Sequence, residues 1–302
     1  MAAELRPLAE TDVRVPIPPA ELLAALCTPP FVPVPGTFNT RDLGLLTRGG
    51  GSSGGGEGGG RGARGSGIRP GFLFRTGGLD ALHGSADGQA AIRDRLGVRR
   101  VFDLRSRLEH ARAPDPAVEG VENVWLGDEG AGPKEESPMT DLAPFVDGHG
   151  EAGYVAMYME VLDRYGGSFR EVLRSVRDRP GEAVLFHCTG MLETLAGYDE
   201  ETVQADYLLS RIGIEVAREQ LLGFAKKYSQ GVASNGSSEA GFDVPGFHNL
   251  VSLRVTCWNA FVEAVGREYG GFEGYVTKVL GFSDEDLVKI KKNLVEEPSL
   301  AE

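Results

Sequence analysis

A mixed α/β domain with a central, mostly parallel sheet flanked by helices is the fold that this sequence predicts. Short apolar runs of strand length alternate with segments of helical periodicity through most of the chain. The 302 residues are 41% hydrophobic, which suits a sizeable core. Residues able to do chemistry stand directly after two of the strand-like runs, and sheets of this class form sites beyond the carboxyl ends of their strands.

The first 35 residues predict an arm that lies along the surface of a domain spanning residues 36–302. Prolines on both sides of residues 20–27 leave room for one short helix there. The domain then contains two stretches that predict surface loops. One is a flexible insertion at residues 49–67, and the other is a polar loop at residues 230–249.

The insertion at residues 49–67 is unusual because twelve of its 19 residues are glycine. Such a composition buries no apolar surface and loses the most backbone entropy on ordering. An RNA-binding segment is a weaker alternative, because there are only two Arg-Gly pairs, at Arg61 and Arg64, and no aromatic residues between them.

Strands are predicted in the first half of the domain. Apolar runs over residues 72–74 and 98–104 enclose a helical segment over residues 90–96. A third run covers residues 121–126, and an acidic loop with proline and glycine follows over residues 127–150.

Helices dominate the second half. The helix predicted over residues 168–179 spaces its apolar residues at i, i+3, i+4 and i+7, and a Pro-Gly pair ends it. The fully apolar strand 183–186 follows. Ser283 is the candidate N-cap of the last helix, and Asp286 three residues later predicts a weakened capping box. The other predicted helices cover residues 154–164, 200–212, 253–269 and 283–295.

Composition and charge exclude several classes of protein. Three cysteines, far apart and with no CxxC pair, fit neither a disulfide scaffold nor a thiolate zinc site, so no metal is expected. A net charge of -13 with only short basic clusters disfavours a nucleic-acid partner. We expect no membrane span and no signal peptide, and hence a cytoplasmic protein, with the nucleus as an alternative.

Cys188 is the candidate nucleophile, because it follows the buried strand 183–186 at once and precedes a turn. Backbone N–H groups at such a strand end, with the dipole of a following helix, lower the pKa of a thiol, and the same N–H groups bind phosphate. The alternative is an inert cysteine buried in the sheet. Cys27 and Cys257 are expected to be buried or inert, and Trp258 to lie in the core with Phe261.

Several segments, in order, resemble the cysteine-dependent protein tyrosine phosphatases, in the fungal and bacterial branch that acts on tyrosine, serine or phosphoinositide phosphates. The resemblance covers nearly all of residues 38–294. The segments that carry it read NTRDLG (39–44), FLFRTG (72–77), RRVFDLRS (99–106), FHCT (186–189), ETVQADYLLSRIG (201–213), YGGFEGYV (269–276) and VLGFSDEDL (279–287).

The resemblance implies a protein-tyrosine-phosphatase-like fold and a two-step hydrolysis without metal or organic cofactor. Cys188 would attack phosphorus and form a cysteinyl-phosphate, with His187 helping to set the thiolate. Thr189 and Gly190 belong to the phosphate-binding loop. Asp103, Arg105, Arg41 and Arg75 either line the site or form an ion-pair network behind it. The partner implied is a phosphorylated protein or a phosphoinositide.

The loop after Cys188 departs from the family pattern. The family's loop reads HCTAGKDRTG, in which the arginine clamps phosphate bidentately and the aspartate before it donates a proton. Here Glu193 and Thr194 stand at those positions, and no arginine occurs before Arg211. Residues 192–197 resemble the end of the helix that follows the loop, so about ten residues are missing by helix-length arithmetic.

The short loop predicts that activity is impaired, and that the missing turns either open a cavity or expose apolar residues. A catalytically dead pseudophosphatase that acts as a binding module is the alternative. A gene model that lacks part of an exon at codons 186–198 would also explain the short loop. A Cys-His hydrolase of acyl esters is a third. It is disfavoured because His187 and Cys188 point to opposite faces of a strand and His248 is expected to be an exposed loop residue.

Overall fold

The computed structural model describes residues 5–46, 67–105, 107–126, 141–186, 191–229 and 242–298. Its centre is a five-stranded sheet in the order β1-β2-β5-β3-β4. Strands β2, β5, β3 and β4 run parallel, and β1 pairs antiparallel at one edge. The bounds are β1 Arg41–Asp42, β2 Leu73–Arg75, β3 Val98–Asp103, β4 Glu122–Trp125 and β5 Ala183–Phe186. The predicted α/β class with a mostly parallel sheet is therefore confirmed.

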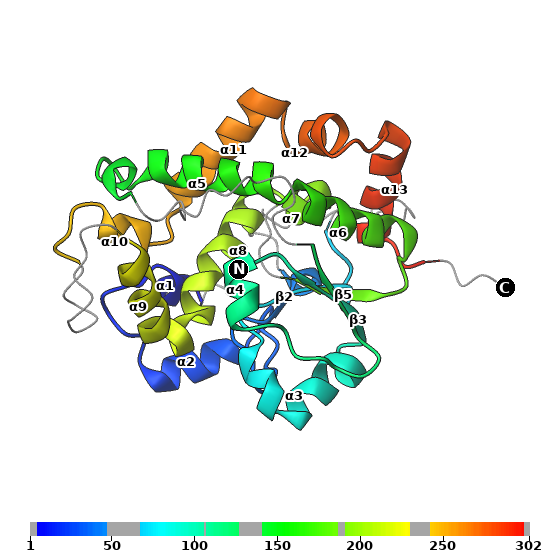
Figure 1. The fold of residues 1–302 in the computed structure, drawn as a ribbon, viewed down its shortest axis with the longest axis horizontal. Coiled ribbons are helices and arrows are strands. Elements are labelled where there is room, and N and C mark those ends of the chain that lie inside the picture. Colours follow the sequence, from blue (N-terminus) through cyan, green and yellow to red (C-terminus); the bar gives the residue numbers. More distant parts are fainter. Residues whose placement is uncertain are drawn as a thin grey trace, which may run out of the picture.

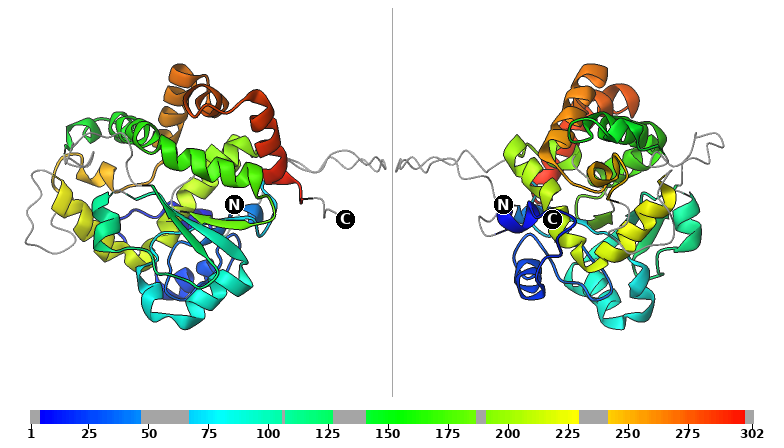
Figure 2. Two further views of the ribbon diagram at one scale, coloured as in Figure 1. Left: turned by 45° about the vertical axis from the view of Figure 1, so that its right-hand side comes forward. Right: turned by 90° about the vertical axis from the view of Figure 1, so that its left-hand side faces the viewer.

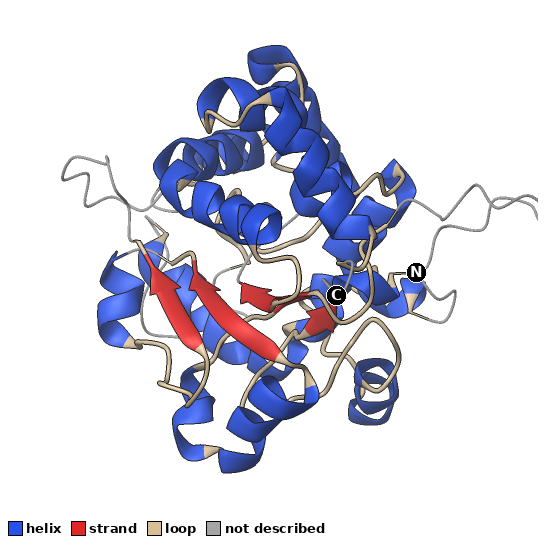
Figure 3. Cartoon of the chain, turned by 90° about the vertical axis from the view of Figure 1, so that its right-hand side faces the viewer, coloured by secondary structure: helices blue, strands red, loops and turns tan. Residues whose placement is uncertain are grey.

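Helices cover both faces of the sheet, as Figures 1 and 3 show. The helices on one face include α5 to α8 and α11 to α13, and α3 lies on the other, with the sheet between them (Figure 2). The bounds are α1 Arg6–Ala9, α2 Pro19–Leu26, α3 Ala86–Ala90, α4 Arg107–Arg112, α5 Glu151–Arg164, α6 Gly166–Asp178, α7 Met191–Leu195, α8 Glu200–Gly213, α9 Arg218–Tyr228, α10 Phe247–Leu250, α11 Val255–Tyr269, α12 Phe272–Gly274 and α13 Asp284–Val295.

The two-residue period of the strands divides the core between these layers. Leu73 and Phe186 point into the larger cluster, with α6, α8, α11 and α13. Their neighbours Phe74 and Leu185 point into the smaller cluster, with Ile92. All four residues of β5 are buried, which explains why its sequence is a continuous apolar run rather than an alternating one.

Most predicted elements lie within a few residues of the observed ones. Strand β5 has the predicted bounds, and α6 buries the whole predicted apolar stripe. The capping box of α13 is present, with Ser283 accepting from the Asp286 N–H and Asp286 accepting from the Ser283 N–H. Trp258 and Phe261 are buried in the main core, as predicted.

The described part of the N-terminal arm packs closely on the domain (Figure 1). Leu5 and Ile17 belong to the main core cluster. Arg211 of α8 donates from Nε to the Thr11 carbonyl at 3.0 Å, and Arg218 of α9 donates from Nε to the Val13 carbonyl at 2.8 Å. Two buried guanidinium groups thus satisfy carbonyls of the arm that have no secondary-structure partner.

Several segments differ from expectation. The loop predicted over residues 230–249 ends early, because α10 begins at Phe247, whose fully buried ring packs with Phe145 and Tyr154. Helices α4 and α9 were not predicted. Strand β1 was not predicted, because its two residues are too few to show the alternation of apolar and polar side chains that marks a strand. Residues 49–66 of the glycine tract and 127–140 of the acidic loop lie outside the described residues.

Removing the side chain of Ser283 tests its role as the N-cap of α13. We expect Ser283→Ala to lower the free energy of unfolding by about 1 kcal/mol, because the Asp286 N–H loses its acceptor. Urea unfolding measures the change. Val288→Ala, at an exposed position of the same helix, is the control, and an equal loss in both variants would contradict the capping role.

Candidate active site

The carboxyl ends of three parallel strands meet at one edge of the sheet, where the sequence predicts the site. Arg75, the last residue of β2, pairs in register with Phe186, the last residue of β5. The N–H of Thr76 donates to the Phe186 carbonyl at 3.0 Å. On the other side of β5, Phe102 pairs with Phe186, so Asp103 lies one residue beyond it. Arg75 and Asp103 therefore flank the end of β5.

The residues that follow β5 are outside the described part of the chain. These are His187, Cys188, Thr189 and Gly190. Their roles as nucleophile, thiolate partner and phosphate-binding loop stay predictions. The described chain resumes with Met191, the first residue of α7, which is only five residues long.

Behind the strand ends, two arginines share one buried carboxylate. Arg41, whose side chain is fully buried, donates from Nε to Asp206 Oδ1 at 2.8 Å. Arg75 donates from Nη1 to Asp206 Oδ2 at 2.7 Å. Arg41 also donates to Asn39 Oδ1 and, at 3.1 Å, to Ser210 Oγ. Every nitrogen of Arg41 is engaged within the protein, so this residue braces the site and does not line it.

Glu193 of α7 completes the cluster. Its side chain is buried, and its carboxyl group hydrogen-bonds that of Asp206. Burial and the charge of Asp206 raise the pKa of Glu193 well above its usual range. Burial also opposes ionisation of Asp206, but the charges of Arg41 and Arg75 outweigh it and lower its pKa to about 2. Two guanidinium groups thus face the carboxylate of Asp206, and burial disfavours a second charge on the neighbouring Glu193.

Backbone geometry around Asn39 and Gly213 positions the Arg41–Asp206 cluster. Asn39 has a positive φ of 57°, a conformation that asparagine tolerates better than most residues. A Cβ atom at Gly213 of α8 would lie 1.8 Å from Asn39 Oδ1, so α8 needs glycine there to approach the Asn39 turn. The register of β1 sets Arg41 opposite Arg75.

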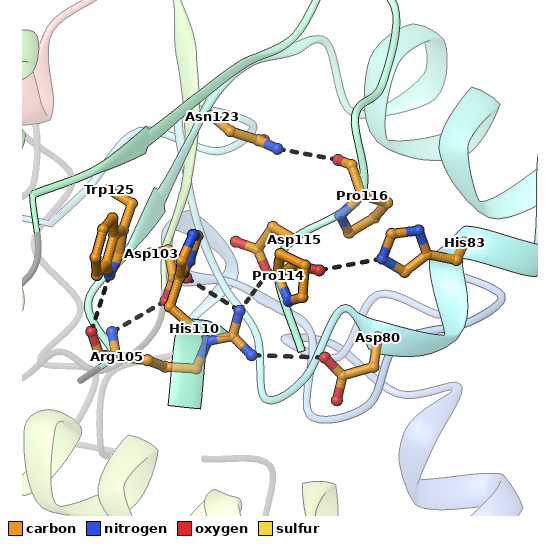
Figure 4. Close-up of polar contacts among 10 residues, drawn as sticks. All are labelled: Asp80, His83, Asp103, Arg105, His110, Pro114, Asp115, Pro116, Asn123 and Trp125. Carbon is orange, nitrogen blue, oxygen red and sulfur yellow. Dashed lines mark hydrogen bonds and ion pairs between the residues drawn. The ribbon is translucent and has the colours of Figure 1, made fainter. Parts of the chain in front are cut away.

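A second cluster surrounds Arg105, as Figure 4 shows. Asp103 accepts from Arg105 Nε at 2.8 Å and from Nη2 at 3.0 Å. Asp115 accepts from Nη2 at 2.8 Å, and Asp80 lies 3.5 Å from Nη1. The ring of His110 lies 2.7 Å from Asp103 through Nδ1 and stacks on Trp125 with centroids 4.1 Å apart. Three carboxyl groups hold this guanidinium in place.

Burial sets the charge state of the second cluster. Burial and the charge of Asp103 raise the pKa of Asp115 to about 6, although Arg105 opposes them. Burial also opposes ionisation of Asp103, but its bonds to Arg105 and His110 lower its pKa. Arg41 and Asp103 thus belong to ion-pair networks, whereas Arg75 and Arg105 also line a cavity. The roles of these four residues in a phosphate site stay predictions.

That cavity has a volume of about 700 Å³ and opens beside α7. Arginines 75, 105 and 112 line one part of it, and aromatic residues of α5, α6 and α11 line another. A cavity in this place agrees with the space expected from a shortened segment after β5. Among the described residues, no three His, Cys, Asp or Glu side chains are grouped to hold a metal ion, and no helix is long and apolar enough to cross a membrane.

Asp206 and Asp115 were missed by the sequence analysis. The sequence signal for Asp206 is a carboxylate between the apolar residues Val203 and Leu209 of α8. Asp115 left none, since it lies in an irregular segment.

Three other residues were assigned from sequence. The Cys257 thiol is buried, as expected, and burial raises its pKa to about 11, whereas Cys27 is exposed. His248 is not an exposed loop residue: it lies in α10 with Nε2 3.4 Å from Asp12 Oδ1.

The arginine–carboxylate cluster predicts a large stability effect. We expect Asp206→Asn to lower the free energy of unfolding by about 3–5 kcal/mol, because it leaves two buried guanidinium charges with one neutral acid. Adding Glu193→Gln prevents Glu193 from ionising in its place and deepens the loss. Asp199→Asn, at the N-cap of the same helix, is the control, since asparagine caps as well as aspartate. Equal losses at both positions would contradict the cluster.

The raised pKa of Asp115 predicts a pH dependence. Between its ordinary value of 3.8 and about 6, the folded chain holds a proton that the unfolded chain releases. Stability contributed by this group is therefore present at low pH and is lost as the pH rises through about 6. In urea unfolding from pH 4 to 7, Asp115→Asn removes this component, whereas the exposed control Asp87→Asn keeps it. Parallel profiles for wild type and Asp115→Asn would contradict the assignment.

Comparison with known proteins identifies the family. A sequence model described as the tyrosine phosphatase family matches residues 32–296. A protein named Tyrosine-protein phosphatase from Nostoc commune is 27% identical over 210 residues, which cover 66% of this chain and 67% of that protein. The family match includes both arginine clusters and the whole sheet. The resemblance seen in the sequence is thereby confirmed: this chain belongs to the tyrosine phosphatase family of enzymes.

Proposed function

We propose that this chain acts on phosphate monoesters of proteins or phosphoinositides through a cysteinyl-phosphate on Cys188, and that its turnover is strongly impaired. The observation that carries the proposal is the position of Arg75. It lines the cavity beside the last residue of β5, so a cation lies next to the strand end that leads into Cys188.

The proposed reaction has two steps. The Cys188 thiolate attacks phosphorus, an S–P bond forms, and the P–O bond to the leaving alcohol breaks as its oxygen takes a proton. Water then attacks phosphorus, the S–P bond breaks, and inorganic phosphate leaves with the thiolate restored. No redox step and no co-reactant other than water is needed.

We infer impairment because no described residue replaces the family's phosphate-clamping arginine or its proton donor. The loop arginine is absent from the sequence, and Arg211, the next one along the chain, is buried and donates to Glu215 and to the carbonyls of Thr11 and Val15. Arg211 is therefore not free to take the place of the loop arginine. Glu193 stands where the family has its acid, but its carboxyl group is buried against Asp206 and it does not line the cavity.

A pseudophosphatase that binds phosphorylated partners is the second candidate. The position of Arg75 at the cavity favours it, because one arginine there can attract phosphate without stabilising the transition state. Binding of phosphate without turnover would distinguish this candidate from a slow enzyme.

Turnover of p-nitrophenyl phosphate tests the proposal. We expect a kcat at least 10²–10³-fold below that of the Nostoc commune relative assayed alongside, because losing one preorganised donor to the transition state typically costs that factor. The residual turnover should vanish in Cys188→Ser and persist in Cys257→Ser.

Two results would count against the proposal. A kcat equal to that of the relative would contradict impairment, and residual turnover unchanged in Cys188→Ser would contradict the nucleophile. Phosphate binding by calorimetry with no turnover at all would favour the pseudophosphatase.

A further inference from the structure

A phenylalanine ring lies at the carboxyl edge of the sheet, next to the end of β2. Phe38 is half-buried and lines the cavity of the site. Its carbonyl accepts from the Gly77 N–H at 2.8 Å, and Gly77 stands two residues after Arg75, the last residue of β2. Arg75 pairs in register with Phe186, which ends β5. Phe38 is thus tied to the edge at which β5 leads into the predicted nucleophile.

The glycine pair that follows β2 leaves room for this ring. A Cβ atom at Gly77 would lie 2.2 Å from Phe38 Cε2, and one at Gly78 would lie 2.7 Å from Phe38 Cε1. Both distances are shorter than real Cβ contacts, so neither position accepts a side chain while the ring stays in place. Neither glycine has a positive φ, so the backbone conformation does not require glycine here. The need for glycine at this pair therefore comes from the ring.

The segment that carries the ring is fixed by hydrogen bonds of its neighbours. The hydroxyl of Thr37 lies 2.7 Å from that of Thr40, which in turn lies 3.0 Å from that of Thr76. Asn39 accepts from the buried guanidinium of Arg41. Because this segment is already ordered, the ring loses little conformational freedom when a ligand packs against it, which favours binding.

The Phe38 ring has no aromatic partner among the described residues. Trp258, Phe261 and Phe272 also line the cavity, but they pack against one another. Aromatic pairs are favoured beyond the area that they bury, in offset or edge-to-face geometry. A ligand that brings its own ring to this edge can therefore form a pair that the folded chain does not form by itself.

We propose that Phe38 determines specificity: its ring packs against the ring of an aryl phosphate, such as a phosphorylated tyrosine side chain, and so favours aryl over alkyl phosphates. Serine, threonine and inositol phosphates carry no aromatic ring, so they lack this contact. This rests on the proposed function for the phosphate chemistry and narrows its alcohol to the aryl class.

Phenyl phosphate and cyclohexyl phosphate are the matched probes, because both join one phosphate to a six-membered ring and only the first ring is aromatic. We expect the wild type to bind phenyl phosphate about threefold to tenfold more tightly, the range that an aromatic pair typically adds. Ligand-observed NMR titration at about pH 8, where both phosphates are fully ionised, measures the dissociation constants. Repeating the titration on Cys188→Ser makes the result independent of turnover.

Variants of Phe38 and of the glycine pair locate the contact. We expect Phe38→Leu to remove the difference between the two affinities, and Phe38→Tyr, which keeps the ring, to preserve it. Gly77→Ala should also remove the difference, because its Cβ displaces the ring. Gly84→Ala is the control, since a Cβ there meets nothing within 4 Å, and it should keep the difference. Thermal unfolding of each variant confirms that it is folded.

Three outcomes would overturn the role of Phe38. These are equal affinities of the wild type for both probes, a preference for phenyl phosphate that persists in Phe38→Leu, and no binding of either probe. The test is separate from that of the proposed function. A preference for phenyl phosphate without hydrolysis would contradict only the hydrolysis, and hydrolysis without that preference would contradict only the role of Phe38.

Discussion

The shared carboxylate of Asp206 is the interaction on which the rest of the site depends. It joins β1, β2 and α8 through Arg41 and Arg75, and its hydrogen bond with Glu193 adds α7. Buried guanidinium groups are costly unless a charge opposes them. Here the carboxylate of Asp206 forms ion pairs with two guanidinium groups. These ion pairs and the hydrogen bond to Glu193 fix the positions of strands β1 and β2 and of helices α7 and α8 relative to one another.

The Arg105 cluster behaves differently although it also contains arginine. Three carboxyl groups surround one guanidinium, and burial weakens the acidity of Asp115. The excess charge there is negative once all three are ionised. The two clusters lie on opposite sides of the end of β5, with Arg75 on one side and Asp103 on the other. The strand that leads into Cys188 therefore runs between the Arg75 cluster and the Arg105 cluster.

The segment after β5 connects the fold with the chemistry. A helix of only five residues occupies α7, and a large apolar cavity lies beside it. The sequence after β5 also lacks the arginine of the family's loop, so the cavity and the predicted impairment concern the same part of the chain.

Much of the architecture was determined by the sequence alone. The apolar run of β5, the stripe of α6 and the capping box of α13 are local patterns, and each has the position that its period or its cap predicted. The arginines of the site could also be named. Their roles could not, because Arg41 and its carboxylate are 165 residues apart in the chain. Only the folded structure decides which arginine is enclosed and which faces the cavity, since burial and charge pairing arise from the packing of distant segments and leave no periodic trace in the sequence.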